Sequence, residues 1–217
     1  MGRFDLPHDF QGPRTGADRA VLLAHGAGSD RNGLALVTVA DALAAAGIPS
    51  LRFDFPYRGA GRKAPDRPPV LLAALRAAAA ELARRTRLDP ARLVLGGRSM
   101  GGRYASLAVG DEAAPLGALG LCLLGYPLHP AGRPERRRDD HFQRIAVPVL
   151  FVSGTRDALG SPVELRRAAR RLPGSVTMHW LETADHGFRP LKASGRTLEE
   201  VLAEATAATV SWIQGLK

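Results

Sequence analysis

Short apolar segments recur along the chain and predict the strands of a buried sheet. Their side chains are continuously apolar, as in AVLLAH and PVLFVSG, and do not alternate with polar ones. Continuous runs of this length are typical of strands that helices cover on both faces. We expect such strands over 20–25, 48–55, 91–97, 118–125, 148–154 and 176–182.

Helical patterns fill the intervals between these runs. Ser161 before Pro162 is a favourable helix start, and Gly47 follows an alanine-rich helix. Strands that alternate with helices predict right-handed crossovers and a mostly parallel sheet. The expected fold class is therefore α/β, a three-layer α/β/α sandwich formed by a single domain over 1–217. The expected helices cover 33–46, 70–87, 99–110, 161–171 and 196–214.

Composition places the chain among ordinary globular proteins. Hydrophobic residues make up 45% and charged residues 24% of its 217 positions. The N-terminal segment contains no apolar run of signal-peptide length, and no stretch approaches the roughly 18 apolar residues that a membrane span needs. We therefore expect a cytoplasmic protein with no membrane span. The single cysteine, Cys122, stands in an apolar run, so a buried structural thiol is expected.

The net charge of +9 raises the possibility of a nucleic-acid partner. However, the arginines are spread from Arg3 to Arg196, with no interleaved aromatic residues and no recognisable nucleic-acid-binding module. Such spreading favours a compositional bias over a binding face. We expect no specific nucleic-acid partner, and an anion or nucleic-acid binder stays the weakest of the alternatives.

Ser99 lies in a glycine-rich segment, GRSMG at 97–101, directly after an expected strand. In a sharp turn from strand to helix, glycines two positions on either side of a serine leave room for strand and helix to approach. The pattern predicts that Ser99 is a nucleophile at the start of the helix 99–110. A purely structural tight turn is the alternative.

A serine hydroxyl needs a base, and His186 is the best placed histidine. It stands in ADHGF, after the last expected strand and before the C-terminal helix, at the edge of the sheet where Ser99 also lies. His25 follows the first strong strand directly, and His179 lies within a strand. The alternative for His186 is a solvated loop position.

The base must in turn be oriented by a carboxylate, and Asp157 follows the strand 148–154. The order serine, aspartate, histidine along the chain is the one that α/β-hydrolases use. Asp185 and Asp54 compete for this role, but Asp185 adjoins the histidine and Asp54 precedes the nucleophile. A surface salt bridge or a helix cap is the alternative for Asp157.

Acyl transfer also needs amide donors for an oxyanion. We expect them from Met100, directly after the nucleophile, and from Ala27 in the loop HGAGSD. The alternative for this loop is a phosphate-binding turn, but Arg31 stands where the third glycine of that fingerprint belongs. Histidine and cysteine spacings predict no metal site, and we expect no cofactor.

These segments together resemble the α/β-hydrolase superfamily from about Ala20 to the C-terminus. The motifs HGAGSD, RFDFPYR, GGRSMGGR, VSGTRDALG and ADHGF are similar to a small lidless group related to the dienelactone hydrolases and the KANL/Tex-type hydrolase-like proteins. The resemblance implies a minimal fold without a cap domain, since 126–142 leaves room only for a long loop. Dienelactone hydrolases use a cysteine nucleophile, whereas this chain has Ser99, so their particular reaction is not expected here.

Several cationic positions are expected near the catalytic edge and could select the substrate. One hypothesis is that guanidinium groups bind a carboxylate or phosphate on it. The alternative is a solvated loop, or one held by Glu135, Asp139 and Asp140, with His129 and His141 as structural anchors. The candidates are Tyr57, Arg58, Arg98, Arg133, Arg136, Arg137 and Arg138.

The leading hypothesis for function is a serine hydrolase that cleaves a small ester or thioester through an acyl-enzyme. Its partner would be a small-molecule acyl substrate, with an anionic one as an open alternative. A peptidase-type hydrolase is less favoured. A non-catalytic interaction protein that kept the hydrolase scaffold is the alternative from another class. The oligomeric state stays open.

Overall fold

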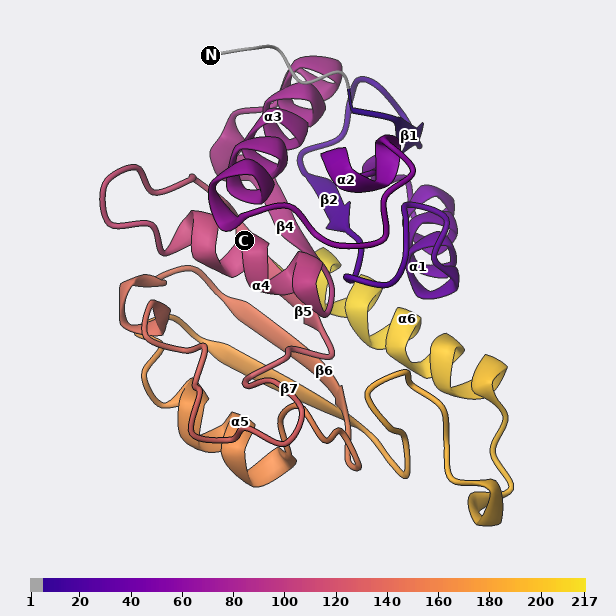
Figure 1. Cartoon of the computed structure of the whole chain (residues 1–217). Helices are drawn as coiled ribbons and strands as arrows, with labels where there is room; N and C mark the ends of the chain where they lie inside the picture. The colour runs from indigo at the N-terminus through magenta and orange to yellow at the C-terminus, as the bar shows by residue number, and fades with distance from the viewer. Residues whose placement is uncertain (1–5) are drawn as a thin grey trace.

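A seven-stranded sheet runs through the centre of the protein, with the strand order β1-β3-β2-β4-β5-β6-β7 (Figure 1). All neighbouring pairs are parallel except β1 and β3. The structure is a computed structural model, and it describes residues 6–217. The expectation of a mostly parallel sheet is confirmed. The strands are β1 (His8–Gln11), β2 (Ala20–Ala24), β3 (Ser50–Phe53), β4 (Leu93–Arg98), β5 (Gly120–Leu124), β6 (Val149–Gly154) and β7 (Val176–Leu181).

Helices cover both faces of the sheet, as the continuous apolar strands require. Val21 and Leu23 of β2 pack with α1 (Leu34–Ala45) and α6 (Leu198–Gln214). Leu22 and Ala24 point to the opposite face, which the other long helices cover. The three-layer α/β/α sandwich is therefore confirmed. The helices on this second face are α3 (Pro68–Thr86), α4 (Met100–Val109) and α5 (Pro162–Ala169).

Two short elements escaped the sequence prediction. Strand β1 has only four residues, all partly exposed, and it pairs with β3 at the edge of the sheet. Helix α2 (Pro56–Gly59) is a single turn. Neither element is long or apolar enough to produce a periodic signal. The first five positions of the expected domain lie outside the described residues.

The predicted helix boundaries have clear physical causes. The Ser161 side chain accepts a hydrogen bond from the backbone N–H of Glu164, whose carboxylate accepts one from the backbone N–H of Ser161, and Pro162 occupies the first turn. Thr197 and Glu200 form the same reciprocal pair at the start of α6. Gly47, just beyond α1, adopts a φ of +73°, which glycine accommodates without strain.

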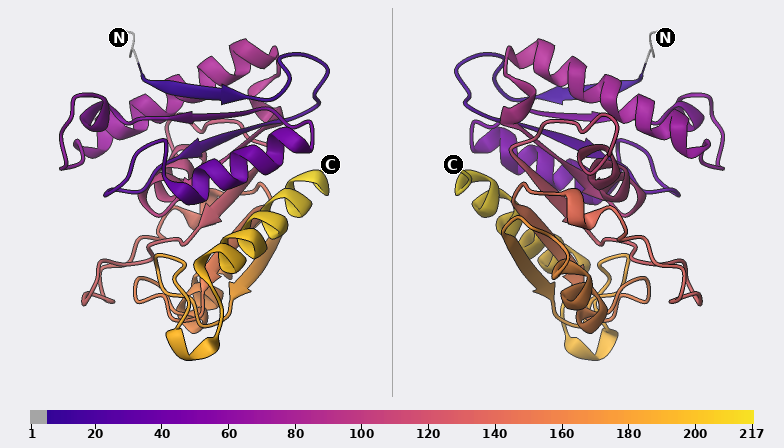
Figure 2. Two further views of the ribbon diagram at one scale, coloured as in Figure 1. Left: turned by 90° about the vertical axis from the view of Figure 1, so that its right-hand side faces the viewer. Right: turned by 90° about the vertical axis from the view of Figure 1, so that its left-hand side faces the viewer.

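The loops that leave the carboxyl ends of the strands gather along one edge of the sheet. Figure 2 shows the connections after β2, β3 and β5 extending from this edge, while the C-terminus lies at the other. The connection after β5 contains only a short 3₁₀ turn, Phe142–Arg144, so no cap domain lies over this edge within residues 6–217. The site residues therefore lie at an open edge.

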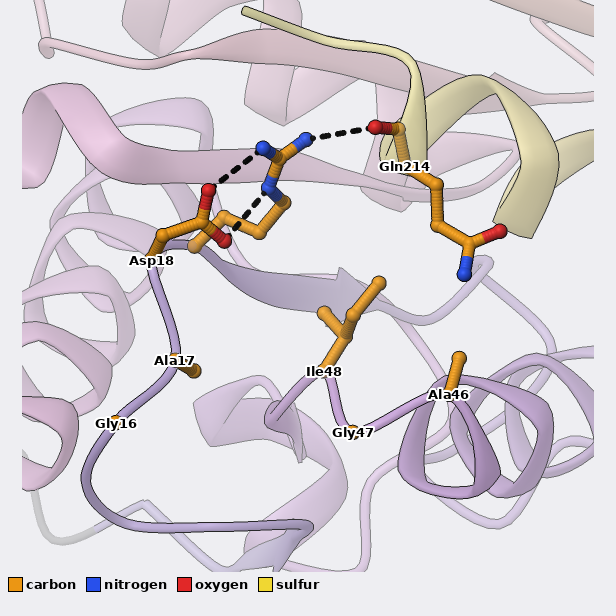
Figure 3. Close-up of a pocket in the computed structure, with 8 residues that line it drawn as sticks. Gly16, Ala17, Asp18, Ala46, Gly47, Ile48 and Gln214 are labelled. Atoms are coloured by element: carbon orange, nitrogen blue, oxygen red, sulfur yellow. Dashed lines mark hydrogen bonds and ion pairs between the residues drawn. The ribbon is translucent and has the colours of Figure 1, made fainter.

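At the opposite edge, Arg19 joins the start of β2 to the end of α6. Figure 3 shows the two sides of this link, with Asp18 before β2 and Gln214 at the end of α6. The Arg19 guanidinium binds Asp18 at 2.7 Å and donates hydrogen bonds to the carbonyls of Ile213 and Leu216 at 2.6 and 2.9 Å. Cationic groups are favourable at a helix C-terminus, where carbonyl groups lack helical partners. A concavity of about 340 Å³ adjoins this link, between the ends of α1 and α6.

The core accounts for the single cysteine. Cys122 is fully buried in β5, and burial raises the pKa of its thiol to about 12. A thiol in this state is not a nucleophile.

Among residues 6–217, no helix combines the length and apolarity that crossing a bilayer requires.

Candidate active site

Ser99 occupies a strained turn between β4 and α4. Its φ is +50° and its ψ is −113°, a region that non-glycine residues rarely adopt and that is typical of functional sites. The flanking glycines are sterically required, because a Cβ at Gly97 or Gly101 would lie 2.0 or 2.1 Å from the carbonyl oxygen of Ala24. Contact with β2 therefore explains the glycines on both sides of the serine.

Ser99, His186 and Asp157 form a continuous chain of hydrogen bonds. The Ser99 Oγ lies 2.9 Å from His186 Nε2, and His186 Nδ1 lies 2.8 Å from Asp157 Oδ2. The Asp157 side chain is fully buried, whereas 27% of the His186 side chain is exposed. An ionised carboxylate only accepts hydrogen bonds, so Nδ1 donates to it and Nε2 is free to accept the serine proton.

Further contacts fix Asp157 and remove its competitors. Asp157 Oδ1 accepts a hydrogen bond from the backbone N–H of Leu159 at 2.8 Å. Asp185 instead accepts the backbone N–H groups of Gly187 and Arg189 and so shapes its own loop. Asp54 binds Arg31, away from the histidine. The structure therefore brings only Asp157 of the three candidates to His186.

Two amide groups beside Ser99 have no acceptor among residues 6–217. They are the N–H groups of Met100, at the start of α4, and of Ala27, in the loop after β2. Gly26 holds this loop against the serine, since a Cβ there would be 3.6 Å from the Cβ of Ser99. Met100 lies in the first turn of α4, where N–H groups lack helical acceptors, and Ala27 is exposed, so both groups are available to a ligand.

His25 holds the loop after β2 from below. The backbone N–H of Phe55 donates to His25 Nε2 at 3.1 Å, so the ring proton must be on Nδ1, which donates to the Gly26 carbonyl at 2.8 Å. Burial lowers the pKa of His25, which keeps the ring in this neutral form. His25 is thus a support for the loop, a role that the sequence analysis did not predict.

Tyr57 and Arg58 follow β3 at the catalytic edge, and both side chains bind residues of the loop after β2. Tyr57 is fully buried, and its hydroxyl donates to the Ala27 carbonyl at 2.8 Å. Arg58 binds Asp30 at 3.1 Å, at the far end of the same loop. Both side chains are already engaged in fixing this loop, because the short helix α2 packs directly beside it.

Arg98 is also engaged within the protein. Its Nη1 donates to the Leu124 carbonyl at 3.0 Å, and its guanidinium lies 4.4 Å from the centre of the Phe188 ring, in the loop that carries His186. Burial lowers the pKa of Arg98 to about 10, and the nearby carboxylates of Asp157 and Asp185 oppose this shift. The Arg98 side chain therefore packs against the loop that carries His186, while its role as a substrate contact stays a prediction.

The arginines of 126–142 divide into two groups. Arg137 binds Asp139 at 2.8 Å, as the alternative of a held loop predicted. Arg136 is exposed and lines a cavity together with Arg103 of α4, which the sequence did not suggest. His141 anchors the loop, since its Nε2 lies 2.8 Å from Ser106 Oγ. Arg103 could have been suspected only from its position one turn after Ser99.

Metal chemistry has no candidate ligand set in the part of the chain that the structure describes. Within it, no three His, Cys, Asp or Glu side chains are grouped so that they could hold an ion. His179 of β7 binds Glu204 of α6 at 2.9 Å. The chemistry of the site therefore has to be argued from the serine, the histidine and the backbone amides.

The chain matches the family described as the alpha/beta hydrolase domain over residues 17–214. This match covers nearly the whole chain and includes all the residues of the site. The protein belongs to the alpha/beta hydrolase family.

Solved structures share this fold at low sequence identity. Est1E from Butyrivibrio proteoclasticus, with ferulic acid bound, is 16% identical, covers 96% of both chains and has a TM-score of 0.74. A dienelactone hydrolase from Anabaena variabilis is 20% identical, with 99% and 94% covered and a TM-score of 0.71. An alpha-beta serine hydrolase homologue from Coxiella burnetii is 19% identical, with 94% and 91% covered and a TM-score of 0.71. These likenesses bear on the fold alone.

Proposed function

We infer that this protein is a serine hydrolase that cleaves a small ester or thioester through an acyl-enzyme. The observation that carries the inference is the hydrogen-bonded chain from Ser99 through His186 to Asp157. It starts on a strained turn, beside two amide groups that have no acceptor within residues 6–217. Each part has a separate role in acyl transfer.

In the first half-reaction, the Ser99 Oγ attacks the carbonyl carbon of the substrate while its proton passes to His186 Nε2. Asp157, which accepts from Nδ1 at 2.8 Å, stabilises the imidazolium that forms. The Met100 and Ala27 N–H groups donate to the developing oxyanion, and each such donor is worth about a hundred- to a thousandfold in rate. The imidazolium then protonates the leaving alkoxide or thiolate, and Ser99 carries the acyl group.

In the second half-reaction, water replaces the leaving group. His186 Nε2 takes a proton from the water as it attacks the acyl carbon, and the same two amides hold the second oxyanion. Collapse of this intermediate releases the carboxylic acid and returns the proton to Ser99. The open edge of the sheet supports this step, since 27% of the His186 side chain is accessible to water.

Names of the structural neighbours support an ester as the substrate. A dienelactone is a cyclic ester, and ferulic acid, bound to Est1E, is a carboxylic acid of the kind that ester hydrolysis releases. The chain has Ser99 at the position of the cysteine nucleophile of dienelactone hydrolases. We therefore propose the bond class and leave the particular lactone reaction aside.

Labelling with a fluorophosphonate probe tests the proposal directly. We expect the wild type to be labelled and Ser99→Ala to remain unlabelled, with turnover of a p-nitrophenyl ester reduced about a millionfold in the variant. Ser211→Ala, on the exposed side of α6, is the matched control and should label like the wild type.

Circular dichroism and thermal unfolding would show that each variant is folded before it is labelled. A folded wild type without labelling, or a folded Ser99→Ala that still reacts, contradicts the proposal. The first outcome would favour the non-catalytic scaffold protein instead.

A further inference from the structure

The arginines near the catalytic edge differ in whether a carboxylate neutralises them. Arg31 and Arg58 have acidic partners in the loops around β2 and β3, and Arg137 and Arg171 have theirs around Asp139. A second group has no carboxylate within 4.0 Å and no side-chain hydrogen bond to any of residues 6–217. Three arginines of this group, Arg103, Arg136 and Arg138, line one cavity and are called the arginine cluster here. Arg133 and Arg189 meet the same criterion but do not line that cavity.

The arginine cluster lines a single cavity of about 630 Å³. Arg137, Glu135 and Asp140 also line it. Asp139 neutralises Arg137 from below, and Asp140 lies 3.7 Å from Arg171. Glu135 is then the one lining carboxylate left to offset the cluster, so the cavity keeps a positive charge.

Two features show that the arginine cluster destabilises the fold when no ligand is bound. The Nε of Arg103 is buried with no partner among the described residues, and an unsatisfied buried donor destabilises a fold. The pKa of Arg138 is lowered by its burial and by the neighbouring cations of Arg103 and Arg136. An anion in the cavity would offset the repulsion among these three cations.

The floor of the cavity is fixed by buried hydrogen bonds. The Tyr126 hydroxyl donates to the Arg138 carbonyl at 2.6 Å, and the Ser106 hydroxyl donates to the Arg103 carbonyl at 2.8 Å. The Asp139 side chain is 3% exposed and holds Arg137. These bonds fix the backbone from which the side chains of Arg103 and Arg138 extend.

The cavity is linked to the nucleophile by α4 and β5. The backbone N–H of Arg103 donates to the Ser99 carbonyl at 3.0 Å, so Arg103 lies four residues, about 6 Å of helical rise, beyond Ser99. The Ser99 N–H donates to the Leu124 carbonyl at 2.9 Å, at the end of the strand from which the loop 126–142 departs. Figure 2 shows this loop extending from the same edge as the loop after β2.

We propose that Arg103, Arg136 and Arg138 bind a carboxylate or phosphate group carried by the ester or thioester that Ser99 attacks. Guanidinium groups pair with both anions through two parallel hydrogen bonds. The proposal rests on the proposed hydrolase function, which supplies the bond that is cleaved. It adds the class of substrate, an acyl compound with a negative charge at a distance from its scissile carbonyl.

A pair of esters with one leaving group tests the preference. The ratio of kcat/KM for mono-p-nitrophenyl glutarate to that for p-nitrophenyl butyrate measures it. We expect this ratio to fall about ten- to hundredfold in Arg136→Gln/Arg138→Gln and in Arg103→Gln, because each removes a charge-assisted bond. Arg133→Gln is the matched control, since Arg133 is exposed on the same loop outside the cavity, and its ratio should equal that of the wild type.

A binding measurement separates this proposal from the proposed function. Calorimetric titration of Ser99→Ala with glutarate, and separately with inorganic phosphate, needs no turnover. We expect saturable binding that Arg136→Gln weakens and Arg133→Gln does not; Arg136 is exposed, so its variant should fold. Binding of the free anions with an unchanged ester ratio would overturn the substrate assignment in favour of a separate anion site, and absence of binding together with an unchanged ratio would overturn the site itself.

Discussion

The two ends of the parallel strands differ in whether their polar groups have hydrogen-bond partners. At the amino ends, Asp18 accepts hydrogen bonds from both Arg19 and Arg92, and Arg19 also donates to carbonyls at the end of α6. At the carboxyl ends, within residues 6–217, the N–H groups of Ala27 and Met100 have no acceptor, and neither does the buried Nε of Arg103.

This difference separates stabilising interactions from binding capacity. Donors that are fully paired strengthen the fold but offer nothing to a ligand. Donors left unpaired weaken the fold slightly and favour any ligand that can accept them. The net charge of +9 is therefore uninformative by itself. What matters is which arginines already have partners.

The largest effect that we expect concerns the base of the carboxyl-end loop 126–142. His141 is 5% exposed, and burial, with the nearby cations of Arg103 and Arg144, lowers the pKa of its ring to about 4. The unfolded chain, with a pKa near 6.5, takes up the proton first as the pH falls. The free energy of unfolding should therefore fall by about 3 kcal/mol between pH 7 and pH 4 on account of this one group.

Urea denaturation of the wild type and of His141→Gln across this range measures the effect. Glutamine does not titrate, and its amide can still donate to Ser106, as His141 Nε2 does at 2.8 Å. The variant should lose about 3 kcal/mol less stability than the wild type over the same pH interval. If both proteins lost the same free energy of unfolding, the loop would not depend on a neutral buried His141 ring. The contrast drawn between the two ends of the strands would then not hold for this loop.

The sequence predicted some parts of the structure better than others, and local signals explain the difference. The strands, the helices and the turn around Ser99 are determined by local signals, namely continuous apolar runs and glycines that contact Ala24. Strand β1 lacks such a signal, because its four partly exposed residues are ordered only by pairing with β3. Topology also brought His186 and Asp157 to the serine, as their chain order predicted.

Side-chain partners were harder to predict than backbone positions. Tyr57 and Arg98 follow strands at the catalytic edge, as expected. However, the Tyr57 hydroxyl donates to the Ala27 carbonyl and the Arg98 guanidinium to the Leu124 carbonyl. Arg103 was missed because its importance depends on what the loop 126–142 leaves unpaired. Such choices depend on contacts between segments far apart in the sequence, which periodicity does not encode.

A smaller effect is expected at the amino ends. Arg19→Ala removes the bonds to the end of α6 and to Asp18, and it should lower the free energy of unfolding by about 2 kcal/mol, since hydrogen bonds of charged groups are worth about 1.5–3 kcal/mol. The melting temperature should fall by roughly 4–8 °C for a chain of this size. Ester hydrolysis by the folded variant should be unchanged.

Arg92→Ala is the matched control for this prediction. The Arg92 side chain is 38% exposed and binds Asp18 at the surface, so we expect a change within about 0.5 kcal/mol. Calorimetry and ester hydrolysis on both variants check the pair. A loss of activity in folded Arg19→Ala would show that the amino ends influence the site, against the separation drawn between the two ends.

The smallest effect tests whether Tyr57 supports the loop after β2 or contacts the substrate. Tyr57→Phe keeps the buried ring and removes only the bond to the Ala27 carbonyl, so the adjacent N–H should be less well oriented. We expect kcat to fall about tenfold with little change in KM, less than the hundred- to thousandfold cost of losing an oxyanion donor. Tyr104→Phe removes the hydroxyl of another tyrosine whose side chain is mostly buried and whose hydroxyl has no hydrogen bond within residues 6–217, so it should leave kcat unchanged. A rise in KM with constant kcat would instead assign Tyr57 to substrate binding, because a contact made equally in the ground state and the transition state changes KM alone.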